Sequence, residues 1–504
     1  MSSITLQPDP TAFDFLLKIR ARAAGKALTV GLPDSDVHAF METDASLRAA
    51  VTEAYAAFER LLASEPTTFD QDETDQVQAL QQGFTNFYAD DAICPYVPLA
   101  AKGPWIITTM GAVVHDSGGY GMLGFGHAPD AVLDAMNKPH VMANIMTPSI
   151  SQRNFIEAID KELGHRHSQG NPFTRYLCLN SGSESVSLAA RLSDVNAKLL
   201  TDDGARYEGR RIKILALDGA FHGRTDRPAQ FSDSTLATYS RHLASFRDSD
   251  RLITTPPNDI DALENVFAQA NRDNVFIESF FIEPVMGEGN PGMGTTREFY
   301  DRARALTKLH GSLLLVDSIQ AGLRAQGCLS IVDYPGFEDC DAPDMETFSK
   351  ALNAGQYPLS VLALTAETAE LYRKGIYGNT MTSNPRALDV ACAVLADVDD
   401  ALRQNIRDRG VELFEKLRAL GIELGGDLYK VQGTGLLASG ELNPDKYKSY
   451  GANSTEEYLR RRGINVIHGG QNALRFTPHF RITSEEIDLI LAAVKDALLN
   501  GPRK

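Results

Sequence analysis

Two residues whose side chains can carry covalent or acid–base chemistry each follow a short apolar run. Asp317 comes directly after GSLLLV, and Lys350 ends the segment PDMETFSK. A carboxylate at such a place needs a cationic partner or several hydrogen-bond donors, because burying a lone charge is costly. A lysine there loses charge by desolvation and can act as an amine nucleophile. Taken alone, Asp317 is more simply explained as a helix cap or ion-pair partner, and Lys350 as a solvated residue.

A third candidate is the turn at residues 180–184 (NSGSE), which leads from an apolar run into a helical pattern. Ser181, Gly182 and Ser183 place two hydroxyls and a small residue beside the free N–H groups of a helix start. Such a start attracts phosphate. A Ser/Gly turn that only caps a helix explains these residues more simply, so the case for chemistry depends on the combination.

The elements that must position these residues alternate between strands and helices. Strands buried on both faces are predicted at Arg175–Leu179, residues 212–217, Val275–Ile282 and residues 313–316, and a further short strand at residues 345–349. Helical patterns at residues 184–200 and 296–309 separate them. This alternation predicts an α/β fold around a mostly parallel sheet. In such sheets ligands bind beyond the carboxyl ends of the strands, where the candidate residues fall.

The rest of the chain is mainly helical. In the N-terminal part, Leu47, Val51, Ala54 and Phe58 recur at helical spacing, and an acidic stretch at residues 70–75 is expected to be exposed. The predicted division is a mainly helical N-terminal extension (1–95), the first part of a small domain with a linker (96–150), a large α/β domain (151–385) and a C-terminal small domain (386–504). Nothing in the extension carries recognisable chemistry.

Composition limits the classes of partner. The net charge of -17 opposes non-specific binding to nucleic acid or an anionic membrane. No apolar run approaches the length of a membrane helix, and the N-terminal MSSITLQPDPTAFDF lacks the pattern of a signal peptide. Five dispersed cysteines without CxxC spacing favour reduced thiols over a disulfide framework. We therefore expect a cytoplasmic enzyme without a metal site.

The candidates belong to a series of seven motifs that, over residues 100–495, resembles the class III aminotransferases, a branch of the fold-type I pyridoxal-phosphate enzymes. The motifs are residues 180–183, 220–225 (AFHGRT), 283–289 (EPVMGEG), 317–322 (DSIQAG), 343–352 (PDMETFSKAL), Thr380 with 384–385, and 474–478 (LRFTP). Each is short, but together they occur in the family's order. The resemblance implies a large domain with a mostly parallel seven-stranded sheet and a smaller α+β domain.

The resemblance also implies pyridoxal 5'-phosphate as the cofactor of the large domain. Lys350 would hold it as an imine and then move a proton, and Asp317 would keep the pyridine nitrogen protonated so that the ring accepts electrons. The other implied cofactor-binding residues are Ser181, Gly182 and Ser183 at the phosphate, Phe221 stacked on the ring, Gln320 at the ring hydroxyl, and His222 and Glu283 in the matching motifs.

Three further residues concern the substrate and the assembly. Arg475 corresponds to the family's arginine that binds a substrate carboxylate, and its guanidinium offers a planar fork for that group. Glu288 lies where relatives place a glutamate that neutralises this arginine and makes room for a distal amine. Thr380 fits the threonine that reaches the phosphate of the neighbouring subunit, which implies a homodimer with the site at the interface. Unconnected surface charges at Arg475 and Glu288 are the alternative.

The chain departs from the family pattern in two places. Ser318 replaces a glutamate after Asp317, and Ala321 replaces a threonine. The opening at residues 116–129 is shortened, so the extra N-terminal residues are expected to supply part of the substrate pocket wall.

Three functions remain open at this point. The first is a ping-pong aminotransferase that takes a distal amine from an amino acid or diamine and passes the nitrogen to a 2-oxo acid. The second keeps the cofactor but has another outcome, as a decarboxylase, racemase or aminomutase. The third is a catalytically idle binding protein that depends on its N-terminal extension.

Overall fold

A seven-stranded sheet forms the centre of the fold. The computed structural model describes residues 11–247 and 249–504. The strand order is β4 (Arg175–Leu179), β10 (Ser360–Leu364), β9 (Met345–Phe348), β8 (Leu313–Asp317), β7 (Val275–Ile282), β5 (Arg211–Leu217) and β6 (Leu252–Thr255). Only β10 runs antiparallel to its neighbours. The expected mostly parallel seven-stranded sheet is confirmed.

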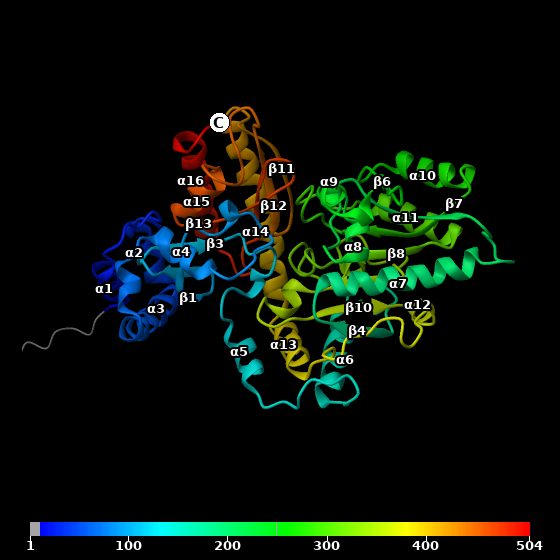
Figure 1. The fold of residues 1–504 in the computed structure, drawn as a ribbon, viewed down its shortest axis with the longest axis horizontal. Coiled ribbons are helices and arrows are strands. Elements are labelled where there is room, and N and C mark those ends of the chain that lie inside the picture. The colour runs from blue at the N-terminus through cyan, green and yellow to red at the C-terminus, as the bar shows by residue number, and fades with distance from the viewer. Residues whose placement is uncertain (1–10, 248) are drawn as a thin grey trace, which may run out of the picture.

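Both faces of this sheet are covered. Successive residues of β7 and β8 belong to different hydrophobic clusters: Phe280 and Leu314 pack with α11 (Arg297–His310), and Phe281 and Leu315 with α7 (Gly182–Thr201). Figure 1 shows α7 lying across the strands. The prediction of burial on both faces is correct for β7 and β8. It is wrong for β4, which is exposed or half-buried over its first four residues because it lies at the sheet edge.

Further helices complete this part and connect it to the others. They are α5 (Asp130–Asn137), α6 (Ile150–Glu162), α8 (Asp226–Phe231), α9 (Asp233–His242), α10 (Ile260–Arg272), α12 (Ala366–Ala369), α13 (Pro385–Ala396) and the long α14 (Asp400–Glu423). Helix α13 packs on α5 and α6. The segment that precedes the first strand of the sheet therefore contacts the segment that follows its last strand.

Two four-stranded sheets combine the ends of the chain. The first has the order β1 (Pro98–Lys102), β2 (Trp105–Thr108), β3 (Val113–Asp116) and β13 (Ile464–Asn465). The second has the order β11 (Leu428–Thr434), β12 (Leu437–Leu442), β15 (Ala473–Phe476) and β14 (Ile467–Gly469). Helices α15 (Thr455–Arg461) and α16 (Ser484–Asn500) lie beside them (Figure 1). Since β13 pairs with β3, distant parts of the sequence share one sheet.

The N-terminal helices are α1 (Ala12–Arg22), α2 (Asp34–Thr43), α3 (Ala45–Ser64) and α4 (Glu73–Gln81). Leu47, Val51, Ala54 and Phe58 are buried on α3, which is the helix that their spacing predicted. Helix α3 packs on β1 and β2, and the Trp105 indole donates to Asp44 Oδ2 at 2.5 Å.

One expectation about this region is wrong. Within the acidic stretch, Glu73 is fully buried, because its Oε2 accepts hydrogen bonds from the backbone N–H groups of Leu28 and Thr29 at 2.8 and 2.7 Å. The carboxylate therefore holds a passing loop against α4.

A histidine–glutamate–histidine triad, in which His115 and Glu486 are buried and His479 is half-buried, ties β3 to the C-terminal helix. Glu486 Oε1 accepts from His115 Nε2 at 3.1 Å and from His479 Nε2 at 2.9 Å. Its Oε2 accepts the backbone N–H of Thr483, which completes the capping box of α16. The two histidines lower the pKa of Glu486 well below its usual range, against the effect of burial, which would raise it.

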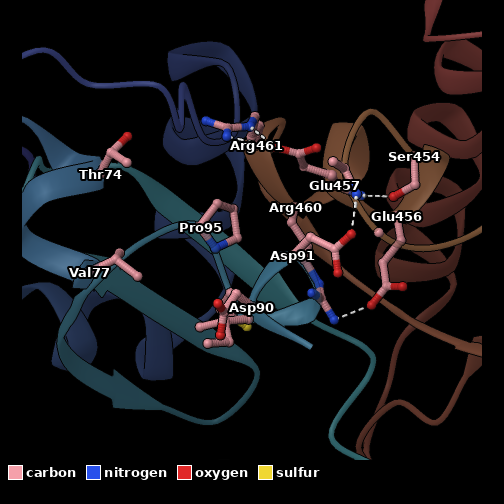
Figure 2. A pocket seen from close by; sticks show the side chains of 14 residues that line it. Thr74, Val77, Asp90, Asp91, Pro95, Ser454, Glu456, Glu457, Arg460 and Arg461 are labelled. Atoms are coloured by element: carbon pink, nitrogen blue, oxygen red, sulfur yellow. Dashed lines mark hydrogen bonds and ion pairs between the residues drawn. The ribbon is translucent and has the colours of Figure 1, made fainter. Parts of the chain in front are cut away.

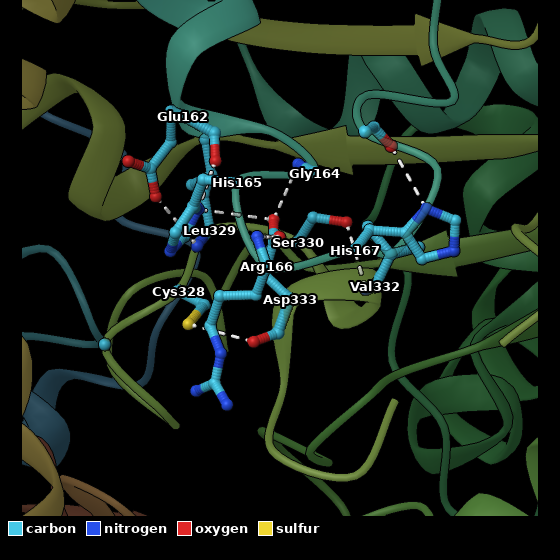
Figure 3. A network of polar contacts seen from close by, with 12 residues as sticks. Glu162, Gly164, His165, Arg166, His167, Cys328, Leu329, Ser330, Val332 and Asp333 are labelled. Atoms are coloured by element: carbon cyan, nitrogen blue, oxygen red, sulfur yellow. Dashed lines mark hydrogen bonds and ion pairs between the residues drawn. The ribbon is translucent and has the colours of Figure 1, made fainter. Parts of the chain in front are cut away.

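A second polar network, shown in Figure 3, fixes the loop that follows Asp317. Asp333, which is fully buried, accepts from the backbone N–H groups of Gly164 and Arg166, both at 2.8 Å. Glu162, at the end of α6, pairs with Arg403 of α14 at 2.6 Å. These contacts connect the loop to α6 and α14.

Among the described residues, no helix is both long and apolar enough to cross a membrane.

Candidate active site

Most of the residues expected at the cofactor lie around one cavity at the carboxyl ends of the parallel strands. The cavity has a volume of about 200 Å³. It is lined by Ser181, Gly182, Ser183, Phe221, His222, Gly223, Glu283, Asp317, Ile319, Gln320, Ser349 and Lys350. All expected cofactor-binding residues except Thr380 are in this set.

One end of the cavity is the start of α7. Ser181 is the N-cap, and its hydroxyl accepts the N–H of Glu184, whose carboxylate in turn accepts from the backbone at Ser181. A Cβ on Gly182 would lie 2.6 Å from Ile319 Cδ1, so a larger residue here would displace the side chain of Ile319 in the loop after β8. The helix start provides a positive end for an anion.

The opposite side of the cavity carries a buried acid. Asp317 is 4% exposed, and its Oδ2 lies 2.8 Å from His222 Nδ1 while its Oδ1 accepts the N–H of Ile319 at 3.2 Å. A carboxylate oxygen has room for further donors. Asp317 thus offers a fixed negative group to a cationic ring nitrogen.

Glu283 holds the backbone around the cavity. Its two oxygens accept the N–H groups of Phe221 at 3.0 Å and Gly287 at 2.8 Å. Burial, with a smaller contribution from Asp317, raises the pKa of Glu283 to about 7, although His222 opposes the shift. Glu283 therefore positions the aromatic residue and the turn before Glu288.

Lys350 follows β9 with a backbone φ of 39°. That region is strained for a residue with a side chain, and the packing around the turn must hold it there. Lys350 Nζ donates to Gln320 Oε1 at 2.8 Å. Burial, and then the nearby Arg475, lower the pKa of Lys350 to about 8, while Glu288, Asp317 and Glu283 oppose this. The amine is therefore easily deprotonated.

An ion pair of a buried arginine with a half-buried glutamate lies beside Lys350. Arg475 Nη1 is 3.0 Å from Glu288 Oε2 and also donates to the carbonyl of Gly287. Arg475 is fully buried, and within the part of the chain that the structure describes its Nε and Nη2 have no hydrogen-bond partner. Its guanidinium lies over the ring of Tyr120, with Cζ 5.5 Å from the centroid. The predicted proximity of Arg475 and Glu288 is thus present.

Thr380 does not line this cavity. It is exposed, and its carbonyl accepts the N–H of Ile145 at 3.3 Å. Thr380 lines a separate hollow, which residues of β4 also line.

Several residues at the site were not singled out from the sequence. Arg224 lies over the ring of Phe221, with Cζ 5.2 Å from the centroid, and Tyr120 lies beside Arg475. Arg224 directly follows the aromatic–histidine–glycine motif, which is the signal that would have indicated it. The departure at Ser318 has a partner too, because its hydroxyl donates to the buried Glu346 at 2.6 Å.

Comparisons with known proteins show the family of this chain. The model of the aminotransferase class III family matches residues 88–498. Ornithine aminotransferase 2 of Staphylococcus aureus is 27% identical over 407 residues, 80% of this chain and 93% of its own length. Acetylornithine aminotransferase of Neisseria meningitidis is 28% identical over 406 residues, 78% and 92% of the two chains.

Solved structures show the same fold. The ornithine aminotransferase of Toxoplasma gondii superposes with a TM-score of 0.71 at 22% identity, over 87% of this chain and 98% of that one. A transaminase from the marine bacterium Virgibacillus gives a TM-score of 0.69 at 18% identity, over 84% and 98%.

The chain therefore belongs to the class III aminotransferases and has the fold-type I architecture. It is an aminotransferase whose cofactor is pyridoxal 5'-phosphate. The cavity fits this cofactor, which carries an aldehyde, a ring nitrogen and a phosphate. An amine with a lowered pKa at Lys350, a buried carboxylate at Asp317 and the start of α7 lie around it.

Proposed function

We propose that this aminotransferase takes the distal amine of a short carboxylate-bearing amine, such as an ornithine-type amino acid, and passes the nitrogen to a 2-oxo acid. The observation that supports this most directly is the 3.0 Å ion pair of Arg475 with Glu288. While Glu288 neutralises Arg475, that guanidinium is not available to a carboxylate at the inner end of the site. An amine-bearing carbon can then approach Lys350 while the charge of Arg475 is balanced. The curated relatives named above are ornithine and acetylornithine aminotransferases.

The residues of this chain have distinct roles in the proposal. The bound cofactor supplies an electron sink for the breaking C–H bond. Lys350 Nζ takes and returns the substrate proton, because its lowered pKa allows it to act as a base near neutral pH. Asp317 fixes the charge at the ring nitrogen, and the start of α7 with Ser181 and Ser183 holds the phosphate. Phe221 keeps the ring in its plane.

Two arginines serve the substrate carboxylates in turn. Arg224 is exposed at the entrance, and among residues 11–247 and 249–504 no carboxylate forms an ion pair with it, so it is available to the carboxylate end of the donor. Arg475 becomes available when Glu288 turns away, and then binds the carboxylate beside the keto group of the acceptor. A planar guanidinium suits both tasks.

The test is to incubate the holoenzyme with one amine at a time, without an acceptor, and to follow the cofactor's colour. Stoichiometric conversion by ornithine-type donors, reversed by a 2-oxo acid, is expected. Release of carbon dioxide or loss of chirality without that conversion would contradict the proposal and indicate one of the other outcomes. Lys350→Ala is the matched inactive control.

We also propose that the enzyme is a homodimer with Thr380 serving the partner's site. Thr380 lies outside the cavity of its own chain and beside exposed apolar side chains, which are Val141 (59%), Met142 (83%), Ile145 (48%), Met146 (82%) and Met381 (57%). A large exposed apolar patch marks a contact surface. A second copy covering it would bring Thr380 to another subunit.

Mixed dimers test the assembly. A homodimer of either variant, Lys350→Ala or Thr380→Ala, is expected to have low activity. If Thr380 acts across the interface, dissociation and reassociation of the two variants forms one site with neither change, so activity returns to a fraction of wild type. Sedimentation in the same buffer reports the dimer, and a monomer with full activity would contradict the proposal.

The four-part division of the chain stands as part of this proposal, supported by the sheet that β3 and β13 share. We further propose the cytoplasm as the location, because the five cysteines are all free.

A further inference from the structure

The segment that joins α4 to β1 reaches the entrance of the active site. We call residues 82–92 the entrance segment. Phe87 lies over Arg224, with the guanidinium carbon 5.5 Å from the ring centroid, while Phe221 lies 5.2 Å from the same carbon. Since Phe221 lines the cofactor cavity, a single arginine is in contact with an aromatic ring of the entrance segment and one of the cavity.

A second aromatic path leads from the entrance segment to the inner arginine. The rings of Tyr88 and Tyr120 stack with centroids 5.7 Å apart, and Tyr120 lies 5.5 Å from the Arg475 guanidinium carbon. Phe87 and Tyr88 are themselves 4.3 Å apart. Burial, and then the neighbouring Tyr88, raise the pKa of Tyr120, so its hydroxyl stays neutral. Phe87 thus contacts Arg224 directly, and Tyr88 is connected to Arg475 through the ring of Tyr120.

The carboxyl end of the entrance segment is fixed to the C-terminal part of the chain. Asp91 Oδ2 accepts the N–H of Ala452 at 3.1 Å, and Arg460 Nη1 donates to the carbonyl of Ala92 at 2.9 Å. Figure 2 shows Asp91 beside Arg460 and Glu456 in the hollow between these parts. This anchor holds the short turn Asp90–Ala92 and thereby sets the place of Phe87 and Tyr88.

Phe87 itself has little protein around it. Its side chain is 73% exposed, and Phe84 in the same segment is 79% exposed. The two differ in their neighbours: within the described chain, Phe84 has neither an aromatic nor a cationic partner, whereas Phe87 contacts Arg224 and Tyr88. An apolar ring beside a cation at the mouth of a cavity suits a ligand with an aliphatic stem and a carboxylate.

We propose that Phe87 and Tyr88 form the outer wall of the amine-donor subsite, where they hold Arg224 for the carboxylate end of a short aliphatic donor and cover its methylene groups. This inference rests on the proposed function and extends it, because it assigns donor specificity to the N-terminal region. The transferred amine would lie at the inner end, near Lys350. A donor without a carboxylate makes no ion pair with Arg224. Its affinity should therefore depend little on Phe87 and Tyr88.

Two five-carbon amines separate these contributions. 5-Aminopentanoate carries the carboxylate, and pentylamine is its match without one. Phe87→Ala is expected to raise KM for 5-aminopentanoate about five- to thirtyfold, the factor that corresponds to one cation–π contact with its packing. The KM for pentylamine should change less than twofold. Tyr88→Ala should act in the same direction, Tyr88→Phe less, and Phe84→Ala is the matched control with wild-type constants for both amines.

Several outcomes would overturn this inference. They are equal effects of Phe87→Ala on the two amines, an effect of Phe84→Ala as large as that of Phe87→Ala, or a lowered dimer affinity that accounts for the loss. The last would mean that the exposed rings contact a second subunit.

Amide hydrogen exchange gives a readout that does not depend on turnover. Exchange across residues 83–92 of the holoenzyme should slow with 5-aminopentanoate and not with pentylamine, and Phe87→Ala should abolish the difference. Protection without any transamination would contradict the proposed function but would still support Phe87 and Tyr88 as a wall of the binding site. Transamination of both amines without selective protection would contradict the wall alone.

Discussion

His222 and Asp317 form a buried pair, with Nδ1 of the imidazole 2.8 Å from Oδ2 of the carboxylate. His222 is 2% exposed and its ring packs edge-on against Phe281 at 5.8 Å. The carboxylate can only accept, so Nδ1–H donates. His222 thereby orients the acid that lies at the end of β8, and it acts on the cofactor ring through Asp317.

This pair predicts a difference between two substitutions at His222. His222→Phe keeps a ring but removes the donor, and kcat is expected to fall about ten- to hundredfold, as for a lost hydrogen bond to a charged group. His222→Asn places an amide N–H where Nδ1–H lies and should recover most of the loss. Steady-state kinetics and the pH profile of the cofactor's absorbance measure both. If the two variants had the same kcat and the same pH profile, His222 would contribute only by its packing.

Lys350 predicts a pH dependence of the apoenzyme's stability. Its pKa is about 8 in the folded protein against an ordinary 10.5. Between these values the unfolded chain binds more protons, so the free energy of unfolding rises with pH over this window. The free energy of unfolding should rise by about 3 kcal/mol in total, because the pKa of Lys350 is about 8 in the folded protein and 10.5 in the unfolded chain. Urea unfolding from pH 7 to 10.5 should show it, and Lys350→Met should remove the difference.

The pair of Glu288 and Arg475 predicts substrate preference. Glu288→Gln removes the negative charge that neutralises Arg475, so the guanidinium becomes available to any carboxylate at the inner end of the site. The ratio of kcat/KM for an α-amino donor such as glutamate to that for ornithine should rise about tenfold or more. Arg475→Lys is the matched variant and should weaken the 2-oxo acid acceptor. An unchanged ratio would exclude this switching role.

The triad at Glu486 predicts an acid-sensitive contribution to stability. The pKa of Glu486 is depressed in the folded state, so its contribution is complete above the ordinary carboxyl range and is lost as pH falls below it. At neutral pH, Glu486→Gln should cost about 2–4 kcal/mol, because His115 and His479 lose the negative charge of their shared acceptor and an amide NH2 cannot accept from the N–H of Thr483. Glu485→Gln, at an exposed position of the same helix turn, should cost little. Urea midpoints at pH 7 and pH 4 provide the comparison.

Much of the central fold could be predicted from local sequence. The strand Val275–Ile282 has the predicted bounds, and α7 differs from its prediction by two residues at its start and one at its end. Asp317 and Lys350 were predictable because the carboxyl ends of neighbouring parallel strands must meet. The strands β6 and β10 were missed. Both are short, and β10 is an antiparallel insertion between β9 and β4, of which β4 lies far away along the chain.

The candidate site was less predictable where contacts are long-range. Tyr88 and Tyr120, or Phe87 and Arg224, are separated by loops and strands, and no periodic pattern connects them. The burial of Glu73 was missed for the same reason, because its partners are backbone N–H groups of a preceding loop. The many acidic residues at positions 70–75 had indicated an exposed segment.

The contact of α3 with Trp105 bears on how this enzyme can be shortened. Leu47, Val51 and Phe69 belong to the same hydrophobic cluster as Trp105 and Val113. A recombinant version trimmed to the family-matched residues 88–498 would lose α3 and so expose Trp105 to water, and it would also lose the last two residues of α16. Such a truncation would aggregate rather than yield a minimal enzyme, whereas a fusion partner attached before residue 11 leaves the cluster whole.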